Sequence, residues 1–300
     1  MVPKLSVVML NYNYSQYIEK AISTILGQSY TPLEFVIIDD CSTDDSVAKI
    51  EKLFAGRPNC HLVRHEQNKG ILHGLQEALN IAKGSHIYLA SSDDYVEPDF
   101  FKTAMDLIKR NPDVGICCGK PIFFWGENEE SRVMHQYLGM RDELQVIDPE
   151  QLVAIFRKSH FAIAGITSIY RRDLMLKYGG FQAGLKSACD GFLIHQIAFR
   201  HPIGYVPMPF AALRNHGSSY SAGISQARRV RVKVFDELML AICREEVAES
   251  FKKSGMLLYF GKRFLLHLLC RPKYWFFLPP ILAKQMVHMK LKFSHLLKER

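Results

Sequence analysis

The chain has 300 residues, of which 48% are hydrophobic, so it can bury a large core, and a disordered chain is excluded. Its seven cysteines form no CxxC pair and none stands near histidines at zinc-finger spacing. Neither a disulfide framework nor a structural zinc site is therefore indicated, and a reducing cytoplasm fits best. The net charge of +8 belongs to the end of the chain, because residues 228–300 hold 16 Lys/Arg against 6 Asp/Glu.

Strands and helices are expected to alternate over residues 1–110. Runs rich in β-branched residues predict strands, and apolar residues at helical spacing predict helices. The expected strands are Leu5–Leu10, Leu33–Ile38, His61–His65 and His86–Ala90, and the expected helices are Gln16–Leu26, one from about Asp44 capped by Ser42 or Thr43, Ile71–Ala82, and one after Pro98. Such alternation indicates an α/β fold with a mostly parallel sheet, where ligands bind at the carboxyl ends of the strands.

The rest of the chain is harder to interpret. A strand is expected around Val114–Cys118, then a loop-rich stretch over Trp125–Arg141, a strand at Ile166–Tyr170, a helix at Arg172–Tyr178 and a helix near Asp190. We therefore divide the chain into residues 1–112, residues 113–226 and a helical, basic tail over residues 227–300. The first apolar run is too short for a signal peptide, and no stretch reaches the roughly 18 to 20 apolar residues of a spanning helix. We expect a cytoplasmic protein.

Acidic pairs follow two of the predicted strands. Asp39 and Asp40 end the second strand, where a carboxylate can accept a hydrogen bond from a nucleotide base; alternatively, they only form a turn and cap a helix. Asp93 and Asp94 end the fourth strand at a solvent-facing position, where they repel one another unless a cation, a donor or water offsets their charge. Mg²⁺ or Mn²⁺ would do so and bind a diphosphate as well; the alternative is a surface turn ahead of Pro98.

Five segments of residues 5–98 together resemble the nucleotide-binding half of glycosyltransferase family 2, whose fold is called GT-A. They are Tyr12-Asn13, Gln28-Ser29-Tyr30 with Glu34, Asp39-Asp40-Cys41-Ser42-Thr43-Asp44, Asn68-Lys69-Gly70-Ile71, and Ala82-Lys83-Gly84. The resemblance continues more weakly through Gly179-Gly180-Phe181, Cys189-Asp190 and Arg214-Asn215-His216. The chain departs from the family pattern at Gln76, where Asn is frequent, at Ser91, which replaces an aspartate, and at Cys189, which replaces a glutamate.

The resemblance implies an inverting transfer from a nucleoside-diphosphate sugar, with a UDP-sugar favoured, to a hydroxyl of a glycan or lipid-linked saccharide of bacterial cell-surface polysaccharides. The implied nucleotide-binding residues are Leu10, Tyr12, Asn13, Asp39, Asp40, Lys69, Ser92 and Asp93, and the implied ligands of Mn²⁺ or Mg²⁺ are Asp93, Asp94 and His216. Ser91 would contact ribose or phosphate without charge, and Arg214 would face the diphosphate. Asp190 is the implied general base; alternatively, it only stabilises a helix start.

Two other functions stay open. Ser91 and Cys189 leave room for a degenerate protein that binds a sugar nucleotide without turnover. A nucleotidyltransferase is less favoured, because Asn11-Tyr12-Asn13-Tyr14 has neither the glycine nor the lysine of a phosphate-binding loop. The remaining histidines show no recognisable constellation, and the cysteines at positions 117, 118 and 189 are expected to be buried.

The tail mixes Lys and Arg with Phe, Tyr, Trp and Leu. Amphipathic basic helices of this kind lie in an anionic membrane interface, which here would be the cytoplasmic face. The alternative is that they pack on the catalytic domain or on a second copy in a homo-oligomer. We do not expect nucleic acid as a partner.

Overall fold

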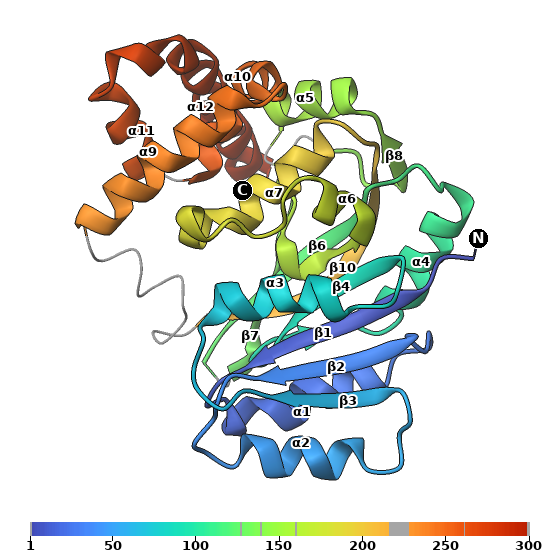
Figure 1. Cartoon of the computed structure of the whole chain (residues 1–300). Coiled ribbons are helices and arrows are strands. Elements are labelled where there is room, and N and C mark those ends of the chain that lie inside the picture. Colours follow the sequence, from blue (N-terminus) through green and yellow to red (C-terminus); the bar gives the residue numbers. More distant parts are fainter. Residues whose placement is uncertain are drawn as a thin grey trace.

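The computed structural model describes residues 2–126, 128–138, 140–159, 161–215, 228–260 and 262–298. The described strands form one sheet in the order β3-β2-β1-β4-β9-β6-β10-β5, with β7 beside β6 and β8 beside β10 (Figure 1). Their bounds are β1 Leu5–Asn11, β2 Glu34–Asp39, β3 Cys60–Arg64, β4 His86–Ser91, β5 Tyr95–Val96, β6 Ile116–Trp125, β7 Asn128–Met134, β8 Gln145–Ile147, β9 Ser168–Arg171 and β10 Ile203–Asn215. Strands β3, β2, β1 and β4 are mutually parallel, as are β6 and β10, and β9 runs antiparallel between them. The expected mostly parallel α/β sheet is confirmed.

Helices cover both faces of this sheet, because successive strand residues point to opposite sides. Val7 and Met9 of β1 join one core cluster with α1, α2 and α4, whereas Val8 joins the other with α3 and α7. The helices of the first two parts are α1 Ser15–Leu26, α2 Ser46–Phe54, α3 Ile71–Ile81, α4 Phe100–Arg110, α5 Pro149–Lys158, α6 Arg172–Lys177 and α7 Cys189–Ala198, with 3₁₀ turns η1 Gly165–Thr167 and η2 Ala183–Ala188.

Two local predictions are wrong. Helix α2 begins at Ser46, and neither Ser42 nor Thr43 caps it, because the Ser42 hydroxyl donates to Asp39 and the Thr43 amide donates to Asn13. The Ser46 amide donates instead to the carboxylate of Asp44. The stretch from Trp125 was expected to be loop-rich, but β7 pairs antiparallel with β6 over much of it. The β7 sequence, NEESRVM, is too polar to show the alternation that marks a strand.

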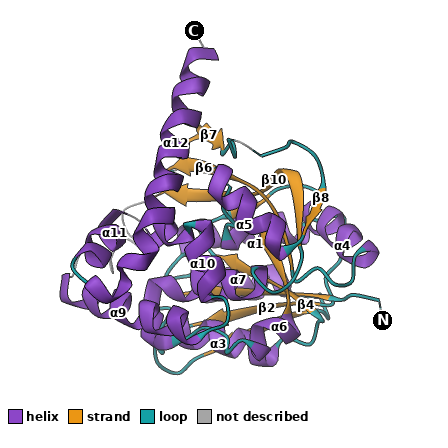
Figure 2. Cartoon of the chain, turned by 90° about the horizontal axis from the view of Figure 1, so that it is seen from above, coloured by secondary structure: helices purple, strands orange, loops and turns teal. Residues whose placement is uncertain are grey.

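The tail folds as helices α9 Arg228–Arg244, α10 Ala248–Ser254, α11 Lys262–Leu269 and α12 Leu278–Lys298, with 3₁₀ turns η3 Met256–Phe260 and η4 Pro272–Phe277. It packs on the middle part of the chain: α10 and α12 contact α5, and α9 contacts η2. Its Leu238, Phe251 and Ile281 share a core cluster with Phe156 of α5. Helix α12 extends past the neighbouring helices towards the carboxyl end (Figure 2). Among the described residues, no helix combines the length and the apolar character needed to cross a membrane.

Candidate active site

The parallel register brings the predicted polar clusters to one edge of the sheet. Asn11 at the end of β1 lies opposite Asp39 at the end of β2, and Leu10 lies opposite Ser91 at the end of β4. Strands β2, β1 and β4 are neighbours in the sheet (Figure 1). Their carboxyl ends therefore bring the predicted nucleotide-binding and metal-binding residues side by side at one sheet edge. Ser92 fastens β4 to β1, because its hydroxyl donates to the carbonyl of Leu10.

Asp39 organises the loops after β1 and β2. Its Oδ2 accepts hydrogen bonds from Nδ2 of Asn11 at 2.7 Å and from Oγ of Ser42 at 2.6 Å, and its Oδ1 accepts one from the Ser42 amide at 2.9 Å. Asn13 has a positive φ of 58° and accepts a hydrogen bond from the Thr43 amide, which ties the two loops together. Tyr12 stands outside this network with 44% of its surface exposed. Asn11, which the sequence analysis overlooked, is thus a central member of the site.

Asp40 is held by the loop that precedes α3. The amides of Lys69 and Gly70 each donate to its carboxylate at 2.8 Å, and Nδ1 of His65 lies 2.8 Å from its Oδ1. Burial acts to raise the pKa of Asp40, but these hydrogen bonds outweigh it and hold the pKa below its usual value. Lys69 therefore contributes its main chain to this loop, and its side chain is exposed.

Asp93 and Asp94 are less accessible than expected. The prediction of a solvent-facing pair is wrong for Asp93, which is only 8% exposed. Ser91 donates to Asp93, and the Arg214 amide donates to Oδ1 of Asp94 at 2.8 Å. Burial, and then the charge of Asp93, raise the pKa of Asp94 to about 7. Two adjacent carboxylates, Asp93 buried and Asp94 half-buried, fit a hard divalent cation such as Mn²⁺ or Mg²⁺, because such ions prefer carboxylate oxygens as ligands.

Arg214 lies against this pair, but its guanidinium is engaged with protein groups. Nε donates to the carbonyl of Asp93 at 3.1 Å, and the other two nitrogens donate to the Gly126 carbonyl and the Tyr95 hydroxyl. The rings of Tyr17 and Phe124 lie 4.2 and 4.6 Å from its central carbon. Arg214 was expected to face the diphosphate. In the structure its amide and its Nε donate hydrogen bonds to Asp94 and to the Asp93 carbonyl, so it holds the acidic pair in place. The third implied metal ligand, His216, lies outside the described residues.

Asp190 comes from the other half of the molecule, in the first turn of α7. Its side chain is exposed, but protein groups surround it enough for the loss of water to raise its pKa. The ring of Tyr259, from η3 of the tail, packs on the neighbouring Gly191, where a Cβ would lie 3.0 Å from its Cε1. The Gly-Gly-Phe turn before Asp190 is tied to α3, since the Phe181 amide donates to Oε1 of Gln76 at 3.1 Å.

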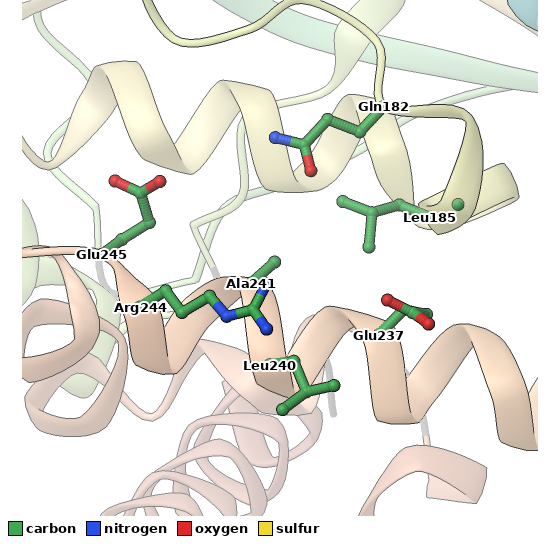
Figure 3. A pocket seen from close by; sticks show the side chains of 8 residues that line it. Gln182, Leu185, Glu237, Leu240, Ala241, Arg244 and Glu245 are labelled. Carbon is green, nitrogen blue, oxygen red and sulfur yellow. The ribbon is translucent and has the colours of Figure 1, made fainter.

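A cavity of about 230 Å³ lies between the segment that leads to Asp190 and helix α9. Figure 3 shows Gln182 and Leu185 on one side of it and Glu237, Leu240 and Arg244 of α9 on the other. None of the predicted site residues lines this cavity. Its lining comes from the segment before α7, from α9 and from Glu245, and not from the loops after β2 and β4.

Comparisons with known proteins agree with this arrangement. The chain is 32% identical over 117 residues to a chondroitin synthase from Escherichia coli, a match that covers 39% of this chain and 17% of that protein. The chain therefore spans less than a fifth of that relative. S. aureus TarS 1–349 in complex with UDP-GlcNAc superposes with a TM-score of 0.66 at 20% identity, covering 88% of this chain and 79% of that one.

A second solved structure extends the likeness along the chain. The mannosyltransferase PcManGT from Pyrobaculum calidifontis, in complex with GDP-Man and Mn²⁺, superposes with a TM-score of 0.58 at 18% identity, covering 99% of this chain and 76% of that one. At these identities the two structures show a shared fold. The sequence profile of Glycosyl transferase family 2 matches residues 6–179, more than half of the chain. Because this match covers more than half of the chain, and the sheet and strand-end carboxylates agree with it, the chain belongs to glycosyltransferase family 2.

Proposed function

We propose that this protein is an inverting glycosyltransferase that moves a sugar from a nucleoside-diphosphate sugar, preferably a UDP-sugar, to a hydroxyl of a glycan or lipid-linked saccharide acceptor. The observation that carries the proposal is the adjacent pair Asp93 and Asp94, of which Asp93 is buried and Asp94 half-buried, at the same sheet edge as the Asp39 and Asp40 network. The solved structures with UDP-GlcNAc and with GDP-Man support a nucleotide sugar as the donor.

Each part of the site has a task in this proposal. The loops held by Asn13, Asp39 and Asp40, with Leu10, Tyr12 and Lys69, receive the nucleoside, and Ser91 and Ser92 border its ribose and phosphates. Asp93 and Asp94 would hold Mn²⁺ or Mg²⁺, and the ion would supply positive charge next to the diphosphate of the donor.

Asp190 removes the proton of the acceptor hydroxyl while that oxygen attacks the anomeric carbon. Its raised pKa suits this task, since a base works best when its pKa approaches the working pH. One base opposite the leaving group gives a single displacement and inverts the anomeric centre.

The test is transfer or hydrolysis with a panel of UDP- and dTDP-sugars and Mn²⁺. We expect EDTA and the Asp93→Ala and Asp94→Ala changes to abolish turnover, and Asp190→Asn to reduce it by about 10² to 10⁴-fold while UDP binding persists. Asp45→Asn is the matched control, because Asp45 is exposed and its side chain caps no helix. Turnover that persists in EDTA or in the Asp190→Asn variant would contradict the mechanism.

A second candidate is a protein that binds sugar nucleotides without turnover. It is favoured by Ser91, which supplies no charge where the family pattern has an aspartate. Calorimetric binding of UDP with no transfer or hydrolysis of any sugar in the panel would support this candidate over the enzyme.

We also propose that the tail attaches the protein peripherally to an anionic membrane surface on the cytoplasmic side. Trp275 and Phe276 are about half exposed next to Lys273, and α12 exposes Met286 and Met289 one turn apart. Aromatic and apolar side chains beside basic ones suit an interface with anionic headgroups. Sedimentation with phosphatidylglycerol vesicles should weaken in a Trp275→Ala variant but not in Trp125→Ala, a control with 53% exposure on β6. Equal sedimentation of both variants would contradict the attachment.

A further inference from the structure

Three side chains beside the loops that contain Asp40 and Lys69, called the nucleotide loops below, form a cluster that was not predicted from the sequence. His65 follows β3, and His73 and Glu77 stand one helical turn apart on α3. One ligand atom of each lies within 4.8 Å of the other two. Nε2 of His65 is 2.8 Å from Oε2 of Glu77, and Nε2 of His73 is 3.6 Å from the same oxygen.

Both ring nitrogens of His65 face carboxylate oxygens, so the cluster is stable only with a positive charge at His65. Its Nδ1 faces a carboxylate oxygen of Asp40, so Nδ1 carries the hydrogen. A neutral imidazole has no second hydrogen, and Nε2 then directs a lone pair at the carboxylate of Glu77. Two acceptors at that separation repel one another. Either a second proton on His65 or a metal ion removes the repulsion.

The surroundings of His65 favour the metal ion. An imidazole whose other nitrogen donates to a carboxylate is the usual support of a metal-binding histidine, because that hydrogen bond fixes the ring and its tautomer. Here Asp40 provides this support. Two imidazoles and one carboxylate are a ligand set of Zn²⁺, with further positions left for water. The i,i+4 spacing of His73 and Glu77 on α3 places the second imidazole beside the same carboxylate, where it can serve as the third ligand.

Access and dimensions also suit an ion. The His65 side chain is 3% exposed and fixed in place, whereas His73 is 52% exposed and Glu77 25%, so an ion can enter from solvent through the helix side. Bonds of about 2.0 to 2.1 Å in a tetrahedron separate ligand atoms by about 3.3 Å. The 2.8 and 3.6 Å separations lie on either side of this value, and all three ligand atoms lie within 4.8 Å of one another, so ion binding requires a rotation of the more exposed His73 and Glu77 side chains.

We propose that His65, His73 and Glu77 bind one divalent transition-metal ion of the Zn²⁺ class, separate from the ion at Asp93 and Asp94. The two sites differ in chemistry, because the strand-end pair offers only oxygen, which suits Mg²⁺ and Mn²⁺, whereas imidazole suits Zn²⁺ and Co²⁺. Asp40 orients His65 and also fixes the loop at Lys69 and Gly70, so this ion sits directly behind the nucleotide loops.

The test is a Co²⁺ titration of the full chain after treatment with EDTA. We expect one equivalent of Co²⁺ with the strong visible absorption of a four- or five-coordinate ion, displaced by one equivalent of Zn²⁺. His73→Ala and Glu77→Gln should each weaken binding at least tenfold, and Asp40→Asn by about 10 to 100-fold through the lost support of His65. His61→Ala is the matched control, an exposed histidine on β3 outside the cluster, and it should bind as the unchanged chain does.

Several outcomes would overturn the proposal. Equal Co²⁺ affinity in the His73→Ala and unchanged chains would place the ion elsewhere, and loss of the visible band in an Asp93→Asn variant would assign it to the strand-end pair. A strong near-ultraviolet band from thiolate ligation would assign it to cysteine. No Co²⁺ band in protein with an unchanged circular dichroism spectrum would leave the doubly protonated His65 as the answer.

Discussion

The guanidinium of Arg214 provides a sharp test of how the acidic pair is supported. Changing Arg214 to lysine keeps the charge but replaces a planar group with three bonded nitrogens by a single ammonium. An ammonium at one position reaches one of the three acceptors, so two oxygens lose their partner, and at least one of these is buried, because Asp93 and Tyr95 are buried whereas Gly126 is exposed. At about 1 to 2 kcal/mol for each, we expect the free energy of unfolding to fall by roughly 2 to 4 kcal/mol. The measurement is urea unfolding followed by circular dichroism.

The matched control for this change is Arg172→Lys. Arg172 also donates to two backbone carbonyls, those of Leu79 and Asn80, but it is only half-buried, so water can replace the lost bonds. We expect that variant to lose less than about 1 kcal/mol. If Arg214→Lys unfolds at the same urea concentration as Arg172→Lys, the supporting role of the Arg214 guanidinium is refuted.

Three further predictions follow from other parts of the molecule. Burial lowers the pKa of Lys284 to about 7, so Lys284→Met should raise the free energy of unfolding at pH 6 by about 2 kcal/mol. The gain should shrink towards pH 10, because above pH 7 the unfolded chain keeps a proton on Lys284 that the folded chain has released, so the unchanged protein becomes more stable as the pH rises. Urea unfolding of both proteins at pH 6 and pH 10 checks this, and an equal gain at the two pH values would contradict it. Gly84→Ala should cost about 2 kcal/mol or more, since its Cβ would lie 2.7 Å from backbone atoms, whereas Gly184→Ala meets nothing within 4 Å; equal melting temperatures would contradict this. With Asp190 as the base, kcat/KM should rise with pH through a midpoint above 3.8, because the loss of water around its carboxyl raises the pKa of Asp190; a midpoint at or below that value would count against the assignment.

The alternating strands and helices of residues 1–110 were predicted well because their sequence signals are local. Strands β1, β2, β3 and β4 lie within one residue of their predicted bounds. The signal is clearest for β1 and β2, which are buried apolar runs that end in polar residues. The strand β7 was missed because a polar edge strand is defined by its partner β6 and not by its own pattern.

The site was predictable in its membership but not in its environment. The strand-end carboxylates could be named from their motifs, and parallel pairing explains why they share an edge. The packing of Arg214 against this pair could not be foreseen, because Arg214 lies 120 residues beyond Asp94 in the sequence and meets it only in the folded chain. The cluster at His65 was missed for the same reason: a strand end and a helix face meet only once β3 and α3 have packed.

Helix α3 has a consequence for how the protein could be redesigned. The Glu77 carboxylate contacts His65, the histidine that is hydrogen-bonded to Asp40. The preceding residue, Gln76, accepts a hydrogen bond from the Phe181 amide in the turn before Asp190. Adding one residue within α3 would rotate everything beyond it by about 100° and remove at least one of these contacts. Residues 71–81 should therefore be exchanged between relatives only as an intact block, together with the Gly-Gly-Phe turn that they contact. Both contacts of the helix, to His65 and to this turn, are then kept.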